Sequence, residues 1–265
     1  MVVRVSVLGS CSKANSTLVQ FGEDALLVDA GFSCRETLRR IALVPGGPSP
    51  DGIRAICLTH EHCDHVSGLR VLQKTLHVPA YATSETARAA DPHGLVEWQY
   101  TTPASAFLVG PFRVTPFRVP HDAYDPVGYR IECGGLAVGI ATDLGMATGV
   151  VRNHLANCDI VVLEANHEPS LLRSSGRPPR LIQRILANHG HLSNDACADL
   201  LAELCAVRSP RHVLLAHLSQ ECNRPETAKY TVYRRLLDAG FASVQVHLTN
   251  PDTPTTVELP SRFPP

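Results

Sequence analysis

Long apolar runs, aromatic residues and net charge are all scarce in this chain of 265 residues. No apolar run approaches the roughly 20 residues that a membrane-spanning helix needs, so we expect no membrane span. A net charge of −1 gives no overall field that would attract nucleic acid, so any contact with a polyanion must be local. Hydrophobic content of 44% and charged content of 18% are ordinary for a globular protein.

The nine cysteines include no C-x-x-C pair, and their number is odd. A reduced protein with buried thiols is the simplest interpretation of this pattern. The chain opens on a strand pattern, Val2 to Leu8, and lacks the features of a secretory leader. We therefore expect a cytoplasmic protein.

The order of predicted elements indicates the fold class. Strand patterns occupy residues 2–8, 17–21, 25–29, 54–58, 105–109, 112–118, 127–132, 136–141, 159–163 and 211–216, with two short strands near the end. Helical patterns occupy residues 33–43, 66–76, 179–188, 194–206 and 225–239. Ser33 and Glu36 form a capping-box pattern at the start of the first helix. Two sets of strands, each with helices, predict a sandwich of two sheets covered by helices on both outer faces. We expect one domain over 1–258 and a loose proline-rich tail over 259–265.

The densest chemical signal is the segment Thr59-His60-Glu61-His62-Cys63-Asp64-His65, which directly follows the apolar strand 54–58. Imidazole and carboxylate groups are ligands for divalent metals. In an extended loop, residues two apart point the same way, so His60 and His62 can reach one ion. Asp64 and His65 follow where the loop turns into a helix, so they can reach a second ion. The alternative is a solvated polar loop with incidental histidines.

Three further residues lie where a predicted strand passes into a loop, namely His121, Asp143 and His217. Strand ends are rigid platforms, which suits the precision that a metal site requires. Each residue alone would be structural more often than functional. Their occurrence in this order after an H-x-H-x-D-H segment predicts that all three are metal ligands.

Together with Val28-Asp29-Ala30-Gly31, these residues resemble the metallo-β-lactamase superfamily. The resemblance implies a four-layer αββα fold (an α+β architecture) with two divalent metal ions, Zn²⁺ or Mn²⁺. The large β-CASP domain of some relatives has no room between Asp143 and His217. By the same resemblance, the first ion would be held by His60, His62 and His121, and the second by Asp64, His65 and His217. Asp143 would bridge both ions, and Asp29 would support the site from beneath.

Four shorter segments are similar to the WalJ/YycJ-type branch, which is related to DNA- and tRNA-processing nucleases. They are Gly9–Ser16, Leu163–His167, Gly190–Asn194 and Ala216–Ser219. In the first segment, Cys11 and Ala14 stand where we would expect glycines. A phosphate-binding role for that loop is correspondingly weaker.

The ligand types favour phosphoester chemistry. A hydroxide held between two cations is a nucleophile near neutral pH, because coordination lowers the pKa of water from about 15.7 towards about 7. An aspartate rather than a cysteine at position 143 makes a harder and more anionic site. Lactam hydrolysis is therefore disfavoured.

His191 is a second candidate catalytic residue beside the ligand Asp64. Through the resemblance, a histidine in this place assists the leaving oxygen, and histidine can supply a proton near pH 7. Glu164 is expected to orient it. The alternative is that His191 only packs at the entry of the helix that follows.

Two segments are candidates for substrate binding. The stretch from Pro169 to Asn194 has no acidic residue and contains Arg173, Arg177, Arg180 and Arg184. It could contact a polyanion, or it could be an ordinary solvated helix face. The hydroxyl and amide groups of Ser12, Asn15 and Ser16 could hold a terminal phosphate, or could simply satisfy a turn.

These observations predict a metal-dependent phosphodiesterase, specifically a 5′-to-3′ DNA exonuclease in DNA repair. Its partner would be single-stranded DNA or a 5′-phosphorylated DNA end. A small-molecule hydrolase acting on a cyclic phosphodiester, lactone or thioester is the first alternative. A regulatory protein that uses the metal domain for partner binding is the second.

Overall fold

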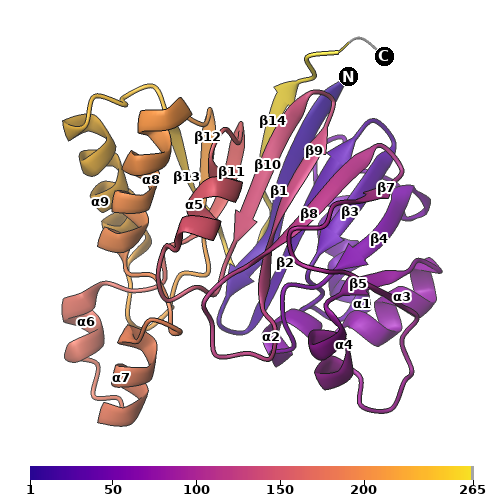
Figure 1. Cartoon of the computed structure of the whole chain (residues 1–265), viewed down its shortest axis with the longest axis horizontal. Helices are drawn as coiled ribbons and strands as arrows, with labels where there is room; N and C mark the ends of the chain where they lie inside the picture. The colour runs from indigo at the N-terminus through magenta and orange to yellow at the C-terminus, as the bar shows by residue number, and fades with distance from the viewer. Residues whose placement is uncertain (264–265) are drawn as a thin grey trace.

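Two seven-stranded sheets pack face to face in the computed structural model, which describes residues 1–263 (Figure 1). In spatial order, sheet A contains β14 (Thr255–Pro260), β1 (Val2–Cys11), β2 (Ala14–Phe21), β3 (Asp24–Val28), β4 (Ile53–Cys57), β5 (Ala80–Ala82) and β6 (Trp98–Tyr100). Sheet B contains β13 (Gln245–Leu248), β12 (His212–Ala216), β11 (Ile160–Glu164), β10 (Leu136–Ala141), β9 (Val127–Cys133), β8 (Phe112–Arg118) and β7 (Phe107–Val109).

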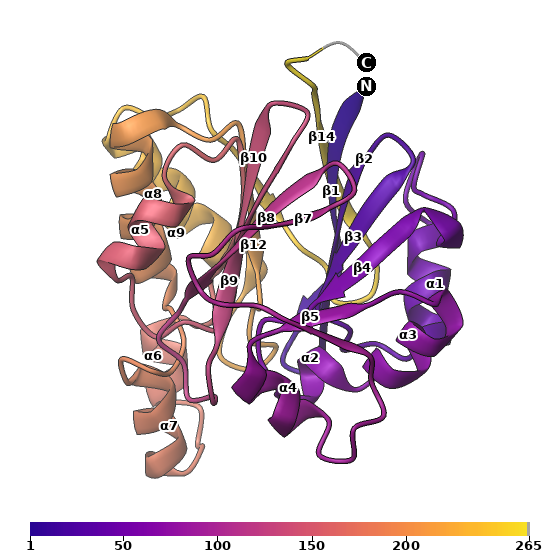
Figure 2. The same ribbon diagram turned by 45° about the vertical axis from the view of Figure 1, so that its right-hand side comes forward.

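Helices cover the outer face of each sheet (Figure 2). Sheet A is covered by α1 (Cys34–Ala42) and α3 (Leu69–Leu76). Sheet B is covered by α5 (Gly149–Leu155), α8 (Asn194–Arg208) and α9 (Pro225–Asp238). One end of the sandwich carries the short helices α2 (Cys63–Val66), α4 (Ser84–Ala90), α6 (Pro169–Arg173) and α7 (Pro179–Leu186). The predicted αββα sandwich is confirmed.

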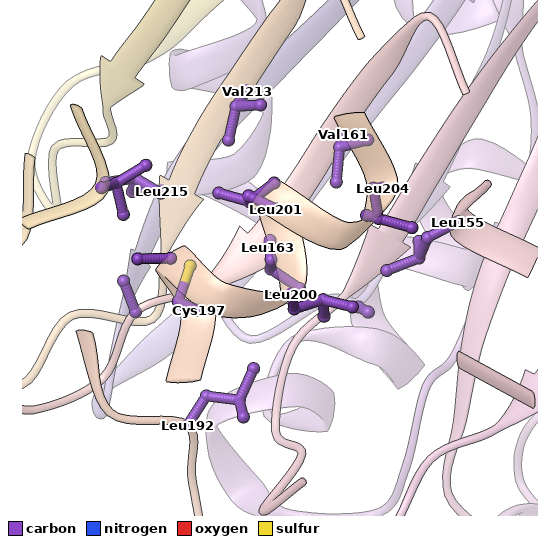
Figure 3. Packing of buried hydrophobic residues seen from close by; sticks show 14 of the residues in the cluster. Leu155, Val161, Leu163, Leu192, Cys197, Leu200, Leu201, Leu204, Val213 and Leu215 are labelled. Carbon is purple, nitrogen blue, oxygen red and sulfur yellow. The ribbon is translucent and has the colours of Figure 1, made fainter. Parts of the chain in front are cut away.

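The central strands have no solvent-facing side, which explains their continuous apolar sequences. In β3, Leu26 and Val28 face sheet B, whereas Leu27 packs under the helices on the opposite side. On the other outer face, α8 lays Leu201 and Leu204 among Val161, Leu163 and Val213 of sheet B (Figure 3). Burial on both faces holds the strand ends in fixed positions.

Strand direction determines where a site can form. Strands β3 to β6 run parallel to one another, and so do β10 to β13. Strand β8 is antiparallel to β9, which is itself antiparallel to β10, so β8 and β10 share a direction. In α/β sheets, ligands bind outside the carboxyl ends of parallel strands. The loops that follow β4, β8, β10 and β12 carry the residues expected to bind metal, and the loop after β3 carries Asp29, which is expected to support them.

Most predicted elements occur where expected, and two strands, 112–118 and 136–141, match residue for residue. The Ser33 hydroxyl caps α1 by accepting the Glu36 amide at 3.3 Å. A continuous helix over 66–76 was wrong, because the chain breaks into α2 and α3 around Gly68. A side chain there would collide with the Phe32 carbonyl oxygen, which lies only 1.8 Å from an ideal Cβ position. The short elements β5, β6, α4, α5 and α6 were not predicted.

The C-terminal segment also differs from expectation. The prediction of a loose tail over 259–265 is wrong for residues 259–260, which belong to strand β14, and residues 264–265 lie outside the described part of the chain. Strand β14 pairs antiparallel with β1, and Leu259 faces Val3 in the core between the sheets. The Arg262 amide then donates to the Gly134 carbonyl at 2.8 Å. Pairing with the edge strand and burial of apolar side chains here outweigh the tendency of proline to interrupt a strand.

Each of the nine cysteines is a free thiol. Among the helices of residues 1–263, none has both the length and the apolar character needed to cross a membrane.

A buried hydrogen bond ties the two sheets together near the histidine-rich loop. The Tyr129 hydroxyl on β9 donates to the carbonyl of Leu58, which follows β4, at 2.6 Å. Tyr129→Phe should lower the free energy of unfolding by about 1–3 kcal/mol, because a buried carbonyl loses its partner. Denaturant unfolding measures the change. Tyr230→Phe, at a side chain on α9 that is 64% exposed, is the control and should leave stability unchanged.

Candidate metal centre

Three of the expected site residues have left-handed backbones at strand ends. Asp29 has φ 65° directly after β3, and His217 has φ 52° directly after β12. Asp143, two residues after β10, has φ 56°. This conformation is unfavourable for residues other than glycine and is enriched at functional sites. At all three positions the strained backbone directs the side chain towards the same edge of the sandwich.

The first predicted ligand set comes together at this edge. His60 and His62, from the loop after β4, meet His121 from the loop after β8, and one ligand atom of each lies within 4.8 Å of the others. His60 Nε2 is 3.0 Å from His62 Nδ1, and His121 Nε2 is 3.3 Å from that same His62 atom. Three ring nitrogens from two loops thus face a common point.

The second predicted set lies beside the first. Asp64 Oδ2 is 3.4 Å from His65 Nε2 and 3.5 Å from His217 Nε2. The helix α2 delivers Asp64 and His65, whereas the end of β12 delivers His217. His65 and His217 are buried, and Asp64 is partly exposed. Sheet A therefore supplies Asp64 and His65, through the segment after β4, and sheet B supplies His217.

Asp143 lies between the two sets. Its Oδ1 is 3.8 Å from His121 Nε2, and its Oδ2 is 3.2 Å from His65 Nε2. Two buried atoms of the site, Asp143 Oδ2 and His217 Nε2, have no hydrogen-bond partner among residues 1–263. Buried polar atoms are normally satisfied, so these two point to a missing partner. Imidazole nitrogens and carboxylate oxygens converging around unpaired buried atoms fit a pair of divalent cations.

The electrostatics of the site fit cation binding as well. Burial lowers the pKa of His60 well below its usual value, and the neighbouring His65 lowers it further, which favours the neutral, metal-binding form. Burial tends to raise the pKa of Asp143, but the charges of His217 and His65 outweigh it and hold that pKa well below its usual range. Asp143 therefore remains an anion, as a bridging ligand must.

Asp29 supports the site from beneath, on the side away from the ligands. One of its oxygens accepts the Thr59 amide at 2.8 Å, and the other accepts His65 Nδ1 at 2.7 Å. This contact directs His65 Nε2 towards the ligand set. The loop containing Asp29 can approach so closely because residue 31 is glycine. A Cβ there would lie 1.8 Å from the Asp64 carbonyl oxygen.

A single carboxylate oxygen joins the second ligand set to His191. Glu164 Oε1 is 2.8 Å from the Nδ1 atoms of both His191 and His217. Its Oε2 accepts the amides of Leu144 and Leu192 at 3.0 and 3.1 Å. Burial lowers the pKa of His191, but the charge and hydrogen bond of Glu164 outweigh it and raise that pKa above its usual value. Glu164 itself keeps a pKa of about 2 despite its burial, through the charge and hydrogen bond of His191.

Ser10 and Asn15 form a second link between ligands, which the sequence analysis missed. Ser10 Oγ accepts the His217 amide at 2.8 Å and donates to Asn15 Oδ1 at 2.7 Å. Asn15 Nδ2 then donates to Asp64 Oδ2 at 3.0 Å. Asn15 was expected to hold substrate phosphate, but its amide is buried against the ligands. We name this Ser10–Asn15 chain of hydrogen bonds the ligand clamp.

An open cavity of about 300 Å³ lies over the ligands. Besides ligand residues it is lined by Ser12, Cys63, Arg184 and His191. Arg184 also forms an ion pair with Asp122, the residue after His121. Ser12 and Arg184 are therefore the expected substrate-binding residues that the fold brings to the cavity. No sequence pattern marked Asp122 or Cys63.

The other expected substrate contacts lie elsewhere. Arg173, Arg177 and Arg180 do not line the cavity, and Arg177 instead pairs with Glu221 at 2.9 Å. These arginines share a segment of sequence with Arg184, but of the four only Arg184 lines the cavity. Ser16 is buried and donates to the Asp29 carbonyl at 2.9 Å, so its hydroxyl cannot reach a phosphate in the cavity.

Comparison with known proteins agrees with the fold. Residues 25–218 match the family model described as a beta-lactamase superfamily domain. The matched segment contains every expected metal ligand and His191. The chain is 31% identical to the exodeoxyribonuclease WalJ of Streptococcus pneumoniae over 261 residues, which cover 95% of this chain and 96% of that protein. It is also 31% identical to the exodeoxyribonuclease YycJ of Bacillus anthracis, over 97% of this chain and 99% of that one.

A solved structure extends the comparison of the fold. The metallo-beta-lactamase fold protein YhfI of Bacillus subtilis superposes with a TM-score of 0.72 at 17% identity, covering 96% of this chain and 99% of that one. At that identity the likeness concerns the fold alone. The family match and the two relatives of nearly full length identify the family. This chain belongs to the WalJ/YycJ branch of the beta-lactamase superfamily and is a hydrolase of the metallo-β-lactamase fold.

Proposed function

We propose that the protein is a dinuclear metal-dependent phosphodiesterase that removes nucleotides from the 5′ end of DNA in the cytoplasm. The observation that carries this proposal is the pairing of two ligand sets around Asp143 with His191 at the wall of the same open cavity. The names of the WalJ and YycJ relatives support DNA as the substrate.

The chain's residues would divide the work between metal binding and proton transfer. His60, His62 and His121 would hold one cation, and Asp64, His65 and His217 the other, with Asp143 between them. Two bound cations, Zn²⁺ or Mn²⁺, would supply a nucleophile from water and neutralise charge on the phosphoryl oxygens. Ser12 and Arg184, on the cavity wall, are the groups placed to contact the phosphodiester itself.

His191 would protonate the leaving oxygen. Its Nδ1 is bound to Glu164, which leaves Nε2 for a group in the cavity that His191 lines. The raised pKa keeps a larger fraction of the ring protonated near neutral pH, as a general acid requires. Glu164 would also fix the orientation of the ring.

One observation favours a second candidate function, a hydrolase of small phosphodiesters. Of the four arginines in the segment 169–194, Arg184 alone lines the cavity. A cavity of about 300 Å³ is large enough for a small substrate. The two functions would use the same catalytic residues. They would differ in whether the substrate extends beyond the cavity as a polymer.

The first prediction tests both metal dependence and substrate. With Mn²⁺ or Zn²⁺, the protein should shorten a 5′-phosphorylated, end-labelled single-stranded DNA stepwise from its 5′ end. Asp64→Ala should lower the rate by more than about 100-fold and reduce bound metal, because a ligand is lost. Asp51→Ala, at an exposed turn, is the control. A protein that binds two metals and cleaves a small phosphodiester but not DNA would establish the second candidate function.

The second prediction concerns His191. His191→Ala should lower kcat by about 100-fold or more, because general acid catalysis contributes roughly 10²–10⁴-fold. Metal content, measured by elemental analysis, should stay near that of the unaltered protein. His189→Ala is a matched control at an exposed histidine two residues away. Equal activity of the two variants would contradict the catalytic role of His191.

The third prediction concerns the ligand clamp. Ser10→Ala should weaken binding of one of the two ions by about 10-fold or more, as loss of groups that orient ligands typically does. Titration with Zn²⁺ against a chelator measures this, and Asn15→Ala should give the same selective loss. Ser6→Ala is the matched control, since Ser6 is also buried in β1 but contacts Thr256 instead. Undiminished affinity for both ions in Ser10→Ala would rule out the clamp.

A further inference from the structure

The loop that supplies His121 also presents an aromatic ring to solvent. It spans residues 119–126, between β8 and β9, and contains Tyr124. The Tyr124 side chain is 74% exposed, the highest value among the large apolar side chains of residues 1–263. Single exposed apolar residues are common on protein surfaces and need no explanation by themselves. Tyr124 differs from the other exposed residues because its loop is held in place beside the predicted metal site.

The backbone around Tyr124 is held from several sides. The Tyr124 amide donates to Glu61 Oε1 at 3.0 Å. The Asp125 carbonyl accepts the hydroxyls of Thr83 and Thr86 at 3.2 and 3.3 Å, and its carboxylate pairs with Arg118 at 2.8 Å. The loop is therefore fixed while the ring remains uncovered. A rigid aromatic group loses little conformational entropy when a ligand stacks on it.

The same contacts place Tyr124 at the rim of the metal-site cavity. Glu61, which holds its amide, lies between the expected ligands His60 and His62. Asp122, two residues before Tyr124, is paired with Arg184 of the cavity wall. Tyr124 thus belongs to a loop that borders the cavity, and two cations, Arg184 and Arg118, pair with Asp122 and Asp125 of that loop.

We propose that Tyr124 is a stacking platform for a nucleobase of a single-stranded polynucleotide whose phosphodiester lies in the cavity. This inference rests on the proposed function. Every nucleobase has an aromatic face, so such a platform binds single strands without reading their sequence. Arginines beside it would neutralise the adjoining phosphates. Base stacking at the rim would add to the affinity of this small cavity for a polymer, since Arg173, Arg177 and Arg180 do not line it.

The test compares two variants on two substrates. Tyr124→Ala should raise KM for a 5′-phosphorylated single-stranded oligonucleotide by roughly 5- to 100-fold, whereas Tyr124→Phe should stay within about twofold of the unaltered protein. The KM for an abasic strand of the same length, which carries no aromatic base, should be unchanged in both. Tyr230→Ala, at an exposed tyrosine on α9, is the matched control for a surface change.

An abasic strand separates stacking from contact with the backbone. Binding of a phosphorothioate oligonucleotide, followed by fluorescence anisotropy with metal present, should weaken in Tyr124→Ala for the normal strand and not for its abasic counterpart. Equal loss on both strands, equal loss in Tyr124→Phe, or no loss in Tyr124→Ala would overturn the proposal. Failure of the unaltered protein to cleave DNA would refute the proposed function instead, and this binding comparison would still decide whether Tyr124 stacks.

Discussion

Buried carboxylates beneath the histidines are the constraint on which the rest of the site depends. Asp29, Asp143 and Glu164 are all almost fully buried at one edge of the sandwich. An unpaired charge in such a place would be strongly destabilising. Asp29 and Glu164 are paired with histidine Nδ1 atoms and backbone amides, which fixes the rings. Asp143 retains an unpaired oxygen, and a cation would satisfy it.

The fold holds this arrangement by placing strained backbone at the ends of well-packed strands. Asp29, Asp143 and His217 each adopt a left-handed conformation that costs about 1–3 kcal/mol. Strands buried on both faces supply the packing that outweighs this cost. The histidine-rich loop is then tied to both sheets, through Asp29 on one side and through the Tyr129 hydroxyl on the other.

The substrate side of the site is built differently from the metal side. The expected metal ligands come from the loops that follow strands and from the first turn of α2. The candidate substrate groups, Arg184 and Tyr124, stand on α7 and on the loop after β8, joined by the ion pair of Arg184 with Asp122. Such peripheral positions can change without disturbing the buried carboxylates.

Sequence alone determined the fold class, most of the strands and the residue types of the ligand sets, because apolar periodicity and the H-x-H-x-D-H spacing are local signals. It did not show which polar residues face the ligands and which face the cavity. Ser10, Asn15 and Ser16 lie within one short segment, yet the clamp takes the first two and the Asp29 carbonyl takes the third. Four arginines look equivalent in the sequence, and of these Arg184 on α7 lines the cavity. Residues 259 and 260, predicted as the start of a loose tail, belong to strand β14 because β1 offers an edge to pair with. Each of these outcomes depends on a partner distant in the chain, so the tertiary structure alone decided it.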